Sequence, residues 1–478
     1  MVSWRYRAAL LGFVLLVANR PTRVVGRSLK ENETASSGGV GAEPDDRYIV
    51  TIDAGSSGSR VHVHKVSAPT AENPIPSIRS AVNKKIKPGL SSFESNPKDA
   101  EGHVNGLVDF ALDNVPQEAW KDTPIFLKAT AGMRSIPEDS ANKIMGVVRG
   151  VFAATNFMFE PDWADVISGT DEAQFSWIAA NYLKGRFTDK DDKPLVGVIE
   201  MGGASLQISY PVEAPGKPND EDYLTINLDK TYHIFAHSFL GYGLDKAQEL
   251  LAEKAAEEIG FCYPEGYSVE GKISGNGNYA KCYNAMDNLI GRSKCPAHPP
   301  NTEHCAIDGK TMPKFNGIKF LAIENFYYTS SFLQTDDHIE ALPKKGKFFC
   351  ARSWEENKAK YSDEEESALQ RYCFSSAFIT ALLEKGFEIP AELLEVARTI
   401  GDNDIDWAIG SVIHDIINLD GGLLGGRKKK EKSSASFSAK SMFMLFAPLA
   451  LLLLAAMYIQ RKRKQGKYRP VSQDNAHD

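Results

Sequence analysis

The sequence predicts an α/β protein with two related halves that face a shared cleft. One observation is that β-branched runs of strand length alternate with helical runs from Arg47 to about Trp163, the pattern of a layered α/β fold. A second is that a strand with a terminal carboxylate and a glycine-serine turn occurs twice, in residues 48–60 and 195–207. The copies are separated by roughly 150 residues, about one domain length. We therefore expect each half to contribute one turn to the cleft.

The composition narrows the possible function classes. The chain has 478 residues, of which 42% are hydrophobic, and this suits a globular protein of two to three domains. Its net charge of −7 argues against a nucleic-acid partner.

The first copy, YIVTIDAGSSGSR, favours an anion site. Its mostly apolar residues 49–52 fit a strand that is covered on both faces, and Gly55 and Gly58 allow a tight turn. Backbone N–H groups and hydroxyls across residues 54–59 form a concave site suited to phosphate, beside Asp53, which can hold a divalent cation through water. Taken alone, the segment also fits an ordinary strand and turn.

The second copy, LVGVIEMGGASLQ, favours phosphate binding over an ordinary turn. It ends its strand in Glu200 and continues with Gly202, Gly203 and Ser205. Neither copy has the Lys-Ser or Lys-Thr of a P-loop or the GxGxxG of a dinucleotide site. The repeat therefore predicts a phosphate site of another kind.

Two further segments supply candidate polar groups. A short apolar strand at residues 125–129 leads into Thr130 and Arg134, which can reach a phosphate, although an arginine after a turn is most often solvated. Residues 166–183 predict a helix whose first turn carries Asp171 and Glu172. These carboxylates fit either a favourable charge at the positive helix end or a general base for water, which contributes ~10²–10⁴-fold in rate. Geometry decides between the two.

Six segments together resemble one family. DAGSSGSR, ATAGMR, SGTDEAQFSWIAANYL, EMGGASLQ, YHIFAHSFLGYG and DWAIG occur in the order found in apyrases, the family of ecto-nucleoside triphosphate diphosphohydrolases and Golgi nucleoside diphosphatases. The likeness covers nearly all of residues 47–418. It implies two lobes of the actin, hexokinase and heat-shock ATPase type (RNase H-like), with an active site between them. It also implies hydrolysis of a nucleoside di- or triphosphate with Ca²⁺ or Mg²⁺.

The resemblance assigns roles by motif. Glu172 matches the catalytic base, Ser205 and Gln207 match residues that hold the attacking water, and Asp53 and Glu200 match carboxylates that bind the metal's waters. The groups expected around the phosphates are small or cationic: Ser56, Ser57, Gly58, Ser59, Arg60, Thr130, Arg134, Gly202, Gly203, Ala204 and Ser205.

Three positions depart from the family pattern. Glu200 stands where many members have Asp, Leu206 where the family has Thr, and Ala173 where Gly is common. None removes a group that the chemistry requires. The longer Glu200 side chain leaves metal preference and substrate order open.

Aromatic and histidine residues allow two readings each. Tyr327 lies in a predicted helical stretch, residues 319–333, and Tyr372 in another helix, where aromatic residues usually form core. The resemblance implies that the base stacks between side chains of these segments, so both are candidates, and such stacking tolerates any base. His233 and His237 lie four residues apart, but without the glutamate of HExxH they favour packing or hydrogen bonding over zinc.

The six cysteines are an even set in the second half of the chain, without a CxxC pair. Disulfides suit an exported chain better than zinc or free thiols do, and the 15 possible pairings stay open from the residues alone. Cysteine order in the resembling family implies Cys350–Cys373, Cys262–Cys295 and Cys282–Cys305.

The chain ends predict export and a membrane anchor. Residues 1–27 read as a signal peptide or uncleaved anchor, and the linker 28–46 holds an N-glycosylation pattern at Asn32. A second linker, 421–441, precedes an apolar run of membrane-spanning length at 442–460 and a basic tail, 461–478, which we expect in the cytosol. The catalytic part is then expected in the Golgi lumen or outside the cell.

Between the linkers we expect lobe I over residues 47–163, with a return segment near 407–420, and lobe II over 164–406. The predicted function is metal-dependent hydrolysis of terminal phosphates of nucleoside tri- or diphosphates. A related phosphotransferase or polyphosphatase and a nucleotide-binding receptor without turnover are the alternatives.

Overall fold

The computed structural model describes residues 47–418 except 68, 70–72, 188–192, 214–219, 270–272 and 298–301. All of these belong to one compact unit, Pro44–Asp478. The predicted leader and linker up to residue 46, with Asn32, and the predicted linker, anchor and tail at 421–478 lie outside the described residues. Across the described ranges, every helix is too short or too polar to cross a membrane.

The first sheet has five strands in the order β3-β2-β1-β4-β5. β1 pairs with β2, and β2 with β3, in antiparallel fashion, whereas β4 runs parallel to β1 and β5 parallel to β4. The strands are β1 (Arg47–Ala54), β2 (Ser59–Ser67), β3 (Ser77–Ile86), β4 (Ile125–Ala129) and β5 (Ala164–Val166). The first sheet thus extends beyond residue 163, where lobe I was predicted to end.

The second sheet has six strands in the order β15-β14-β6-β7-β9-β8. The strands are β6 (Gly197–Met201), β7 (Ser205–Pro211), β8 (Tyr223–Asn227), β9 (Thr231–Leu240), β14 (Phe320–Glu324) and β15 (Leu394–Val396). β6 has an antiparallel partner, β7, after its turn and a parallel partner, β14, on its other side. β1 has the same arrangement with β2 and β4, so the repeated sequence design corresponds to a repeated sheet design.

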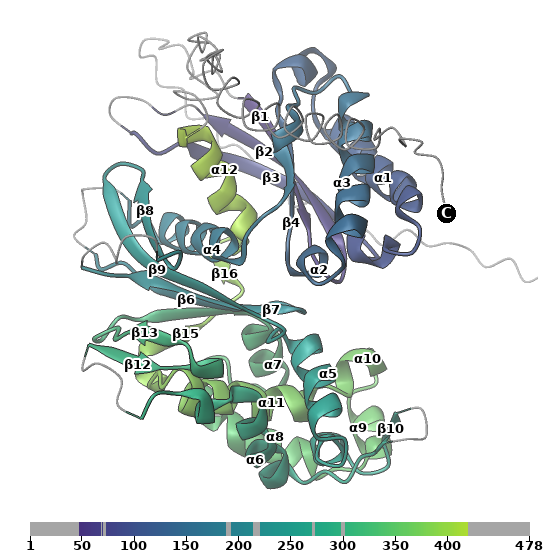
Figure 1. The fold of residues 1–478 in the computed structure, drawn as a ribbon, viewed down its shortest axis with the longest axis vertical. Helices are drawn as coiled ribbons and strands as arrows, with labels where there is room; N and C mark the ends of the chain where they lie inside the picture. Colours follow the sequence, from purple (N-terminus) through teal and green to yellow (C-terminus); the bar gives the residue numbers. More distant parts are fainter. Residues whose placement is uncertain are drawn as a thin grey trace, which may run out of the picture. The chain divides into compact units, whose positions relative to one another are not determined.

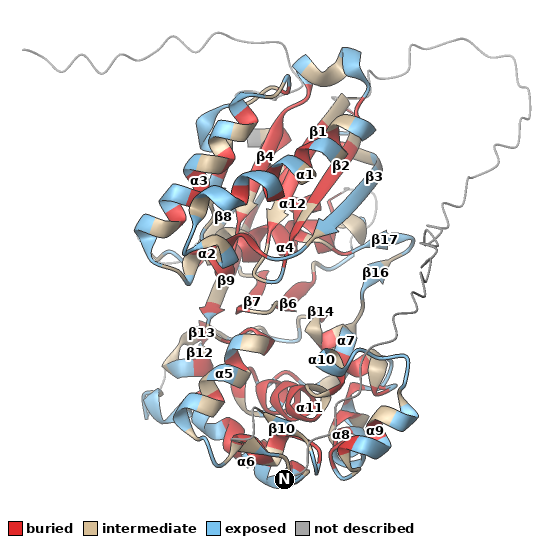
Figure 2. Cartoon of the chain, turned by 90° about the vertical axis from the view of Figure 1, so that its right-hand side faces the viewer, coloured by how far each residue is buried: buried red, intermediate tan, exposed pale blue. Residues whose placement is uncertain are grey.

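Helices cover the sheets on both sides (Figure 1). α1 (Ala100–Asn114) and α3 (Glu138–Ala153) pack on the first sheet, with α2 (Ala131–Arg134) after β4. Their outer faces are exposed while the strands β1, β2 and β4 beneath them are buried, as Figure 2 shows. The far side of the second sheet carries α5 (Leu244–Lys254), α6 (Tyr279–Ile290), α7 (Asn325–Phe332), α8 (Leu342–Cys350), α9 (Trp354–Lys360), α10 (Glu366–Leu369) and α11 (Tyr372–Ala381).

Two helices connect the sheets. α4 (Gly169–Leu183) packs on the second sheet, and α12 (Trp407–Asn418) packs against α4. The opposite side of α12 contributes Val412 and Ile416 to a buried cluster with Ile49 of β1. The end of the described chain therefore ties the first sheet to the helix that lies on the second.

Short two-stranded hairpins complete the architecture. The hairpins pair β10 (Ser268–Val269) with β11 (Ile273–Ser274), β12 (Glu303–Cys305) with β13 (Thr311–Pro313), and β16 (Thr399–Ile400) with β17 (Asn403–Asp404).

The helix predicted over 319–333 is wrong in its first part, because Phe320–Glu324 form strand β14, buried between β6 and β15. His233 and His237 lie on strand β9. Nδ1 of His233 lies 3.2 Å from the hydroxyl oxygen of Thr225, and Nδ1 of His237 lies 2.7 Å from Oδ1 of Asp222.

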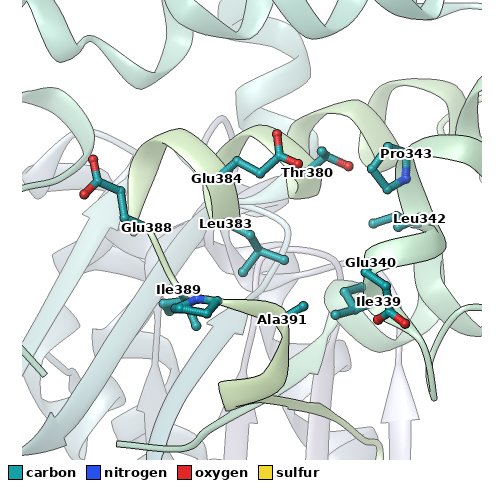
Figure 3. A pocket seen from close by; sticks show the side chains of 11 residues that line it. Ile339, Glu340, Leu342, Pro343, Thr380, Leu383, Glu384, Glu388, Ile389 and Ala391 are labelled. Atoms are coloured by element: carbon teal, nitrogen blue, oxygen red, sulfur yellow. The ribbon is translucent and has the colours of Figure 1, made fainter. Parts of the chain in front are cut away.

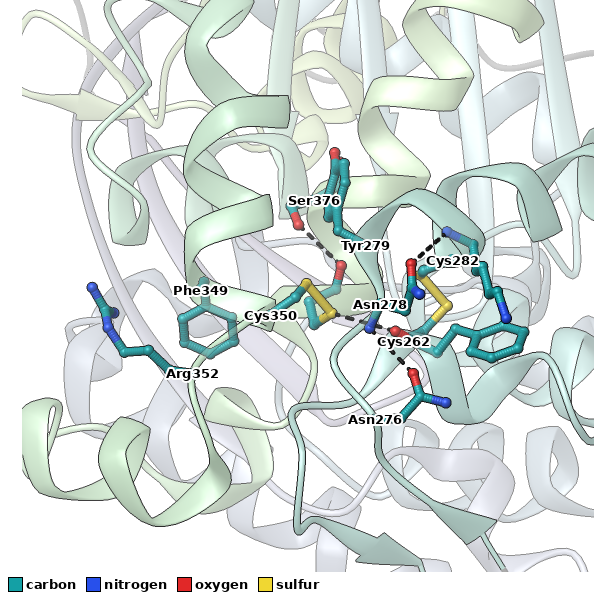
Figure 4. The surroundings of a disulfide bond; sticks show 12 residues. Cys262, Asn276, Asn278, Tyr279, Cys282, Phe349, Cys350, Arg352 and Ser376 are labelled. Atoms are coloured by element: carbon teal, nitrogen blue, oxygen red, sulfur yellow. Dashed lines mark hydrogen bonds between the residues drawn. A yellow bond between two sulfur atoms is a disulfide. The ribbon is translucent and has the colours of Figure 1, made fainter.

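The disulfides correct two of the three pairings that the resemblance implied. Cys350–Cys373 is present, but the others join Cys262 to Cys282 and Cys295 to Cys305. Figure 4 shows Cys262 joined to Cys282, which lies in the first turn of α6. Cys295 follows the other end of that 12-residue helix, which is about 18 Å long. The predicted pairings Cys262–Cys295 and Cys282–Cys305 are therefore wrong, because each of these cysteines is bonded to another partner.

The contact between α4 and α12 requires a glycine at position 410. A Cβ atom at Gly410 would lie 1.9 Å from the carbonyl oxygen of Phe175. We predict that Gly410→Ala lowers the free energy of unfolding by about 1–3 kcal/mol, because the helices must separate. Gly150→Ala in α3 is the control, since its added Cβ meets no atom within 4 Å. Chemical denaturation of both variants checks this, and equal stability of Gly410→Ala and wild type would contradict the packing role.

Candidate active site

The two glycine turns line one cleft. The turn after β1 and the turn after β6 both border a cavity of about 450 Å³. They also approach each other closely, because a Cβ atom at Gly203 would lie 2.9 Å from Oγ of Ser56. The predicted site residues along this cavity are Asp53, Ser56, Ser57, Gly58, Arg60, Thr130, Glu172, Glu200, Gly202, Gly203, Ala204 and Ser205.

Helix α4 separates the roles of its two acidic residues. Ser168 caps the helix by accepting a hydrogen bond from the Asp171 amide at 3.0 Å, and Asp171 accepts one from the Ser168 amide at 3.2 Å. Asp171 therefore belongs to the cap. Glu172, one position later, is buried and lines the cleft. The geometry thus separates the two readings that the sequence left open.

Arg134 holds the Glu172 carboxylate in place. Its Nη2 lies 2.8 Å from Oε2 of Glu172, while its Nη1 donates to the carbonyl of Ile167 at 3.0 Å. Burial raises the pKa of Glu172 above its usual value, and the charge of Arg134 opposes that rise. The carboxylate is consequently more basic than a solvated one, yet has a fixed cationic partner.

Glu200 reaches from the second sheet toward α4. Its Oε2 accepts a hydrogen bond from the hydroxyl of Ser176, and that hydroxyl lies 3.1 Å from the carbonyl oxygen of Glu172. Burial, and then the charge of Glu172, raise the pKa of Glu200 well above its usual range. Ser176 therefore links the Glu200 carboxylate to the backbone of Glu172, one turn earlier in α4.

Gln207 lies directly opposite Glu200 in the β6–β7 pair, so the two side chains share one face of the sheet. Its Nε2 donates to Oγ of Ser205 at 2.6 Å and to Oγ of Ser238 at 3.1 Å. Ser238 was not predicted from the sequence. It orients the amide of Gln207 from the neighbouring strand β9.

Asp53 carries an unsatisfied oxygen. Its Oδ1 is buried and has no hydrogen-bond partner among the described residues. Burial, and then the charges of Asp406 and Glu172, raise the pKa of Asp53 well above its usual range. An unpaired buried carboxylate oxygen is unfavourable, and a cation or ordered water would satisfy it.

One residue expected to contact phosphate, Ser59, does not line the cleft. The Ser59 side chain is buried, and its Oγ lies 2.9 Å from Nε2 of His103 on α1. The hydroxyl therefore faces the core of the first sheet and not the cleft, because Ser59 already belongs to β2.

Several residues from distant segments join the cleft without having been predicted. Asp406 accepts from Arg60 at 3.2 Å and from the amide of Ala408 at 2.9 Å, and lies 3.3 Å from His62. Burial raises the pKa of Asp406, but His62 and Arg60 outweigh it and hold that pKa well below its usual range. The other unpredicted polar residues of the wall include Lys85, Lys87, Asp245, Glu324, Asn325 and Arg371.

The predicted base-binding tyrosines lie in an adjoining pocket. Tyr327 and Tyr372 line a cavity of about 580 Å³, and Tyr328 borders both this cavity and the phosphate cleft. One face of the Tyr372 ring stacks on Phe332, with centroids 3.6 Å apart and planes 4° apart. The pocket that these tyrosines line therefore adjoins the phosphate cleft at Tyr328 of α7.

A separate cavity of about 430 Å³ lies between α8 and the end of α11 (Figure 3). Apolar side chains such as Leu383 and Ile389 form its floor, and Glu384 and Glu388 stand at its rim. None of the predicted site residues lines it.

A mixed α/β fold with two repeated carboxylate-glycine turns around one polar cleft suits an enzyme that acts on phosphate compounds. Residues 40–420 match the GDA1/CD39 (nucleoside phosphatase) family, and the chain belongs to that family.

Similar proteins agree with this assignment. "Probable apyrase 6" of Arabidopsis thaliana is 34% identical over 77% of this chain and 72% of its own length. The Golgi apyrase of Saccharomyces cerevisiae is 27% identical, with 89% and 83% covered, and ectonucleoside triphosphate diphosphohydrolase 1 of Bos taurus is 26% identical, with 94% and 93% covered. A nucleoside triphosphate hydrolase structure from Neospora caninum shares the fold, with a TM-score of 0.57 and 16% identity over 79% of this chain and 93% of that one.

Proposed function

We propose that this nucleoside phosphatase removes terminal phosphates from nucleoside tri- and diphosphates, with Glu172 as the general base that activates water. The observation that carries the proposal is the buried Glu172 carboxylate, oriented by Arg134 and lining the cleft between the two glycine turns. Burial raises the pKa of Glu172, which makes its carboxylate a better proton acceptor than a solvated one.

The turns supply the binding site for the phosphate chain. Backbone N–H groups across residues 56–58 and 202–205, with the hydroxyls of Ser56, Ser57 and Thr130, surround its negative charge. Ser205 and Gln207 hold the attacking water beside Glu172 and fix its approach. Because phosphoryl transfer leaves little covalent work for the protein, positioning and preorganised charge account for most of the acceleration.

The carboxylates fit a hydrated divalent cation. Asp53 has an unpaired buried oxygen, Glu200 is a second carboxylate that lines the same cleft, and oxygen donors suit Ca²⁺ and Mg²⁺. Among the residues that the structure describes, no three acidic, histidine or cysteine side chains are placed to ligate a metal directly, which favours binding through water. When bound, such an ion neutralises phosphate charge and orients the substrate.

The nucleotide base is proposed to stack against Tyr327 and Tyr372, in the pocket that adjoins the phosphate cleft at Tyr328. Stacking on a π-face accepts every base, so activity on several bases follows.

We also propose that residues 47–166 with 407–418, and residues 167–406, act as two lobes around this cleft. The predicted anchor at 442–460 would place the lobes in the Golgi lumen or outside the cell. The three disulfides and the kinship with a Golgi apyrase and an ectonucleotidase support that side of the membrane.

Glu172→Gln is expected to lower kcat for phosphate release ~10²–10⁴-fold with little change in KM, because it removes the proton acceptor and retains the side-chain shape. Released phosphate and nucleotide products are measured together, with Glu253→Gln on the exposed face of α5 as the matched control. Unchanged phosphate release in Glu172→Gln would contradict the base role. Transfer of the phosphoryl group to an acceptor other than water would favour a phosphotransferase.

The pH dependence tests the ion pair. Glu172 must be ionised to act as a base, so kcat/KM falls as pH drops through the pKa of Glu172. Arg134→Gln removes the charge that opposes burial, and the acidic limb of the profile is therefore expected to shift to higher pH. Arg149→Gln is the control, because Arg149 pairs with Asp165 at the surface. A limb that stays in place, or shifts to lower pH, would sink this assignment.

Removal of divalent cations is expected to abolish turnover. Treatment with EDTA followed by addition of Ca²⁺ or Mg²⁺ measures both the loss and the recovery. Full turnover in excess EDTA is the result that the cation proposal does not allow.

A further inference from the structure

Glu324 lies at a corner of the cleft that the proposed chemistry does not use. It is the last residue of β14, in register with Met201 of the parallel strand β6, just before the second glycine turn. The next residue, Asn325, donates from Nδ2 to the carbonyl oxygens of Met201 at 2.8 Å and Gly202 at 3.2 Å. The corner is thereby attached to the phosphate-binding turn.

The backbone at this corner favours glycine, yet the residue is a glutamate. Glu324 has φ 59° and ψ −120°, a left-handed conformation that side chains with a Cβ rarely adopt. The side chain lines the cleft.

The Glu324 carboxylate has no dedicated partner. It makes no hydrogen bond or ion pair with any residue in the described part of the chain, although Asp406, Arg60, Lys85 and Arg398 contribute to the electrostatic field around it. Ionised carboxylates accept hydrogen bonds only, and both oxygens of Glu324 are therefore available to donors from a ligand.

The position of Glu324 indicates which part of a nucleotide it meets. The phosphate-binding turn is attached to one side of the corner, and Tyr328, four residues later on α7, borders both the cleft and the aromatic pocket. A nucleotide with phosphates at the turns and its base among the tyrosines must pass its sugar between them. Ribose presents two adjacent hydroxyl donors there, which one carboxylate can accept together.

We propose that Glu324 accepts hydrogen bonds from the 2′- and 3′-hydroxyls of the substrate, and that the protein selects ribonucleotides over sugars that lack these groups. This inference rests on the proposed nucleotide hydrolysis and names its sugar specificity.

The test compares adenosine diphosphate with 2′,3′-dideoxyadenosine diphosphate, because the two differ only in the sugar hydroxyls. Wild type is expected to show kcat/KM about 10-fold or more higher for the ribonucleotide, the size of an effect from hydrogen bonds to a charged acceptor. Glu324→Gly is expected to reduce this ratio to near 1 by lowering turnover of the ribonucleotide alone. Glu324→Gln, which retains one oxygen and the side-chain length, should give an intermediate ratio.

Two controls keep the result interpretable. Glycine suits the φ and ψ of this corner, so Glu324→Gly is expected to unfold at the wild-type temperature or higher. Glu392→Gln, an exposed glutamate beside β15, is expected to leave the ratio unchanged.

The contrary outcomes separate this inference from the proposed function. Equal kcat/KM for the two substrates in wild type, or an equal loss on both in Glu324→Gly, would overturn the sugar contact and leave nucleotide hydrolysis standing. An equal loss would assign the carboxylate to the phosphates or their cation instead. Wild type that releases phosphate from neither substrate would overturn both.

Discussion

The structure depends on the burial of several carboxylates around one cleft. Asp53 ends a strand of the first sheet, Glu200 lies near the end of a strand of the second, and Glu172 comes from the helix between them. Burial raises the pKa of all three, repulsion from nearby carboxylates raises the pKa of Asp53 and Glu200 further, and Glu172 has an arginine partner at 2.8 Å. This arrangement is unfavourable in isolation. It persists because rigid strands and packed helices hold the carboxylates in place, and a bound cation would offset their charge.

The packing of α12 explains how the two sheets share a site. α12 contacts β1 through one side and α4 through the other, and Gly410 permits the close approach to α4. At the beginning of α12, Asp406 accepts hydrogen bonds from both Arg60 and the helix backbone. The segment that holds the two sheets together therefore also orients the Arg60 guanidinium at the cleft.

The sequence predicted the features that local patterns encode. Both turns could be identified because a strand, a carboxylate and glycines are contiguous, and their repetition implied that they meet. The local helix pattern could not choose between Asp171 and Glu172, and only the family resemblance selected Glu172, because the capping bond to Ser168 decides which side chain turns inward. Glu324, Asp406 and Ser238 escaped prediction since only sheet register and helix packing bring them to the cleft. The two incorrect disulfides have the same cause, because α6 separates residues that the cysteine order alone would pair.

The central claim is that the two turns bind one phosphate chain while Glu172 orients the attacking water. A crystal structure with a non-hydrolysable nucleoside triphosphate analogue and a divalent cation tests this most directly. The account predicts the terminal phosphate between the Ser56 and Gly203 turns, with a water within hydrogen-bond distance of both Glu172 and the terminal phosphorus oxygens. A phosphate chain bound elsewhere, or a Glu172 carboxylate directed away from it, would contradict the account.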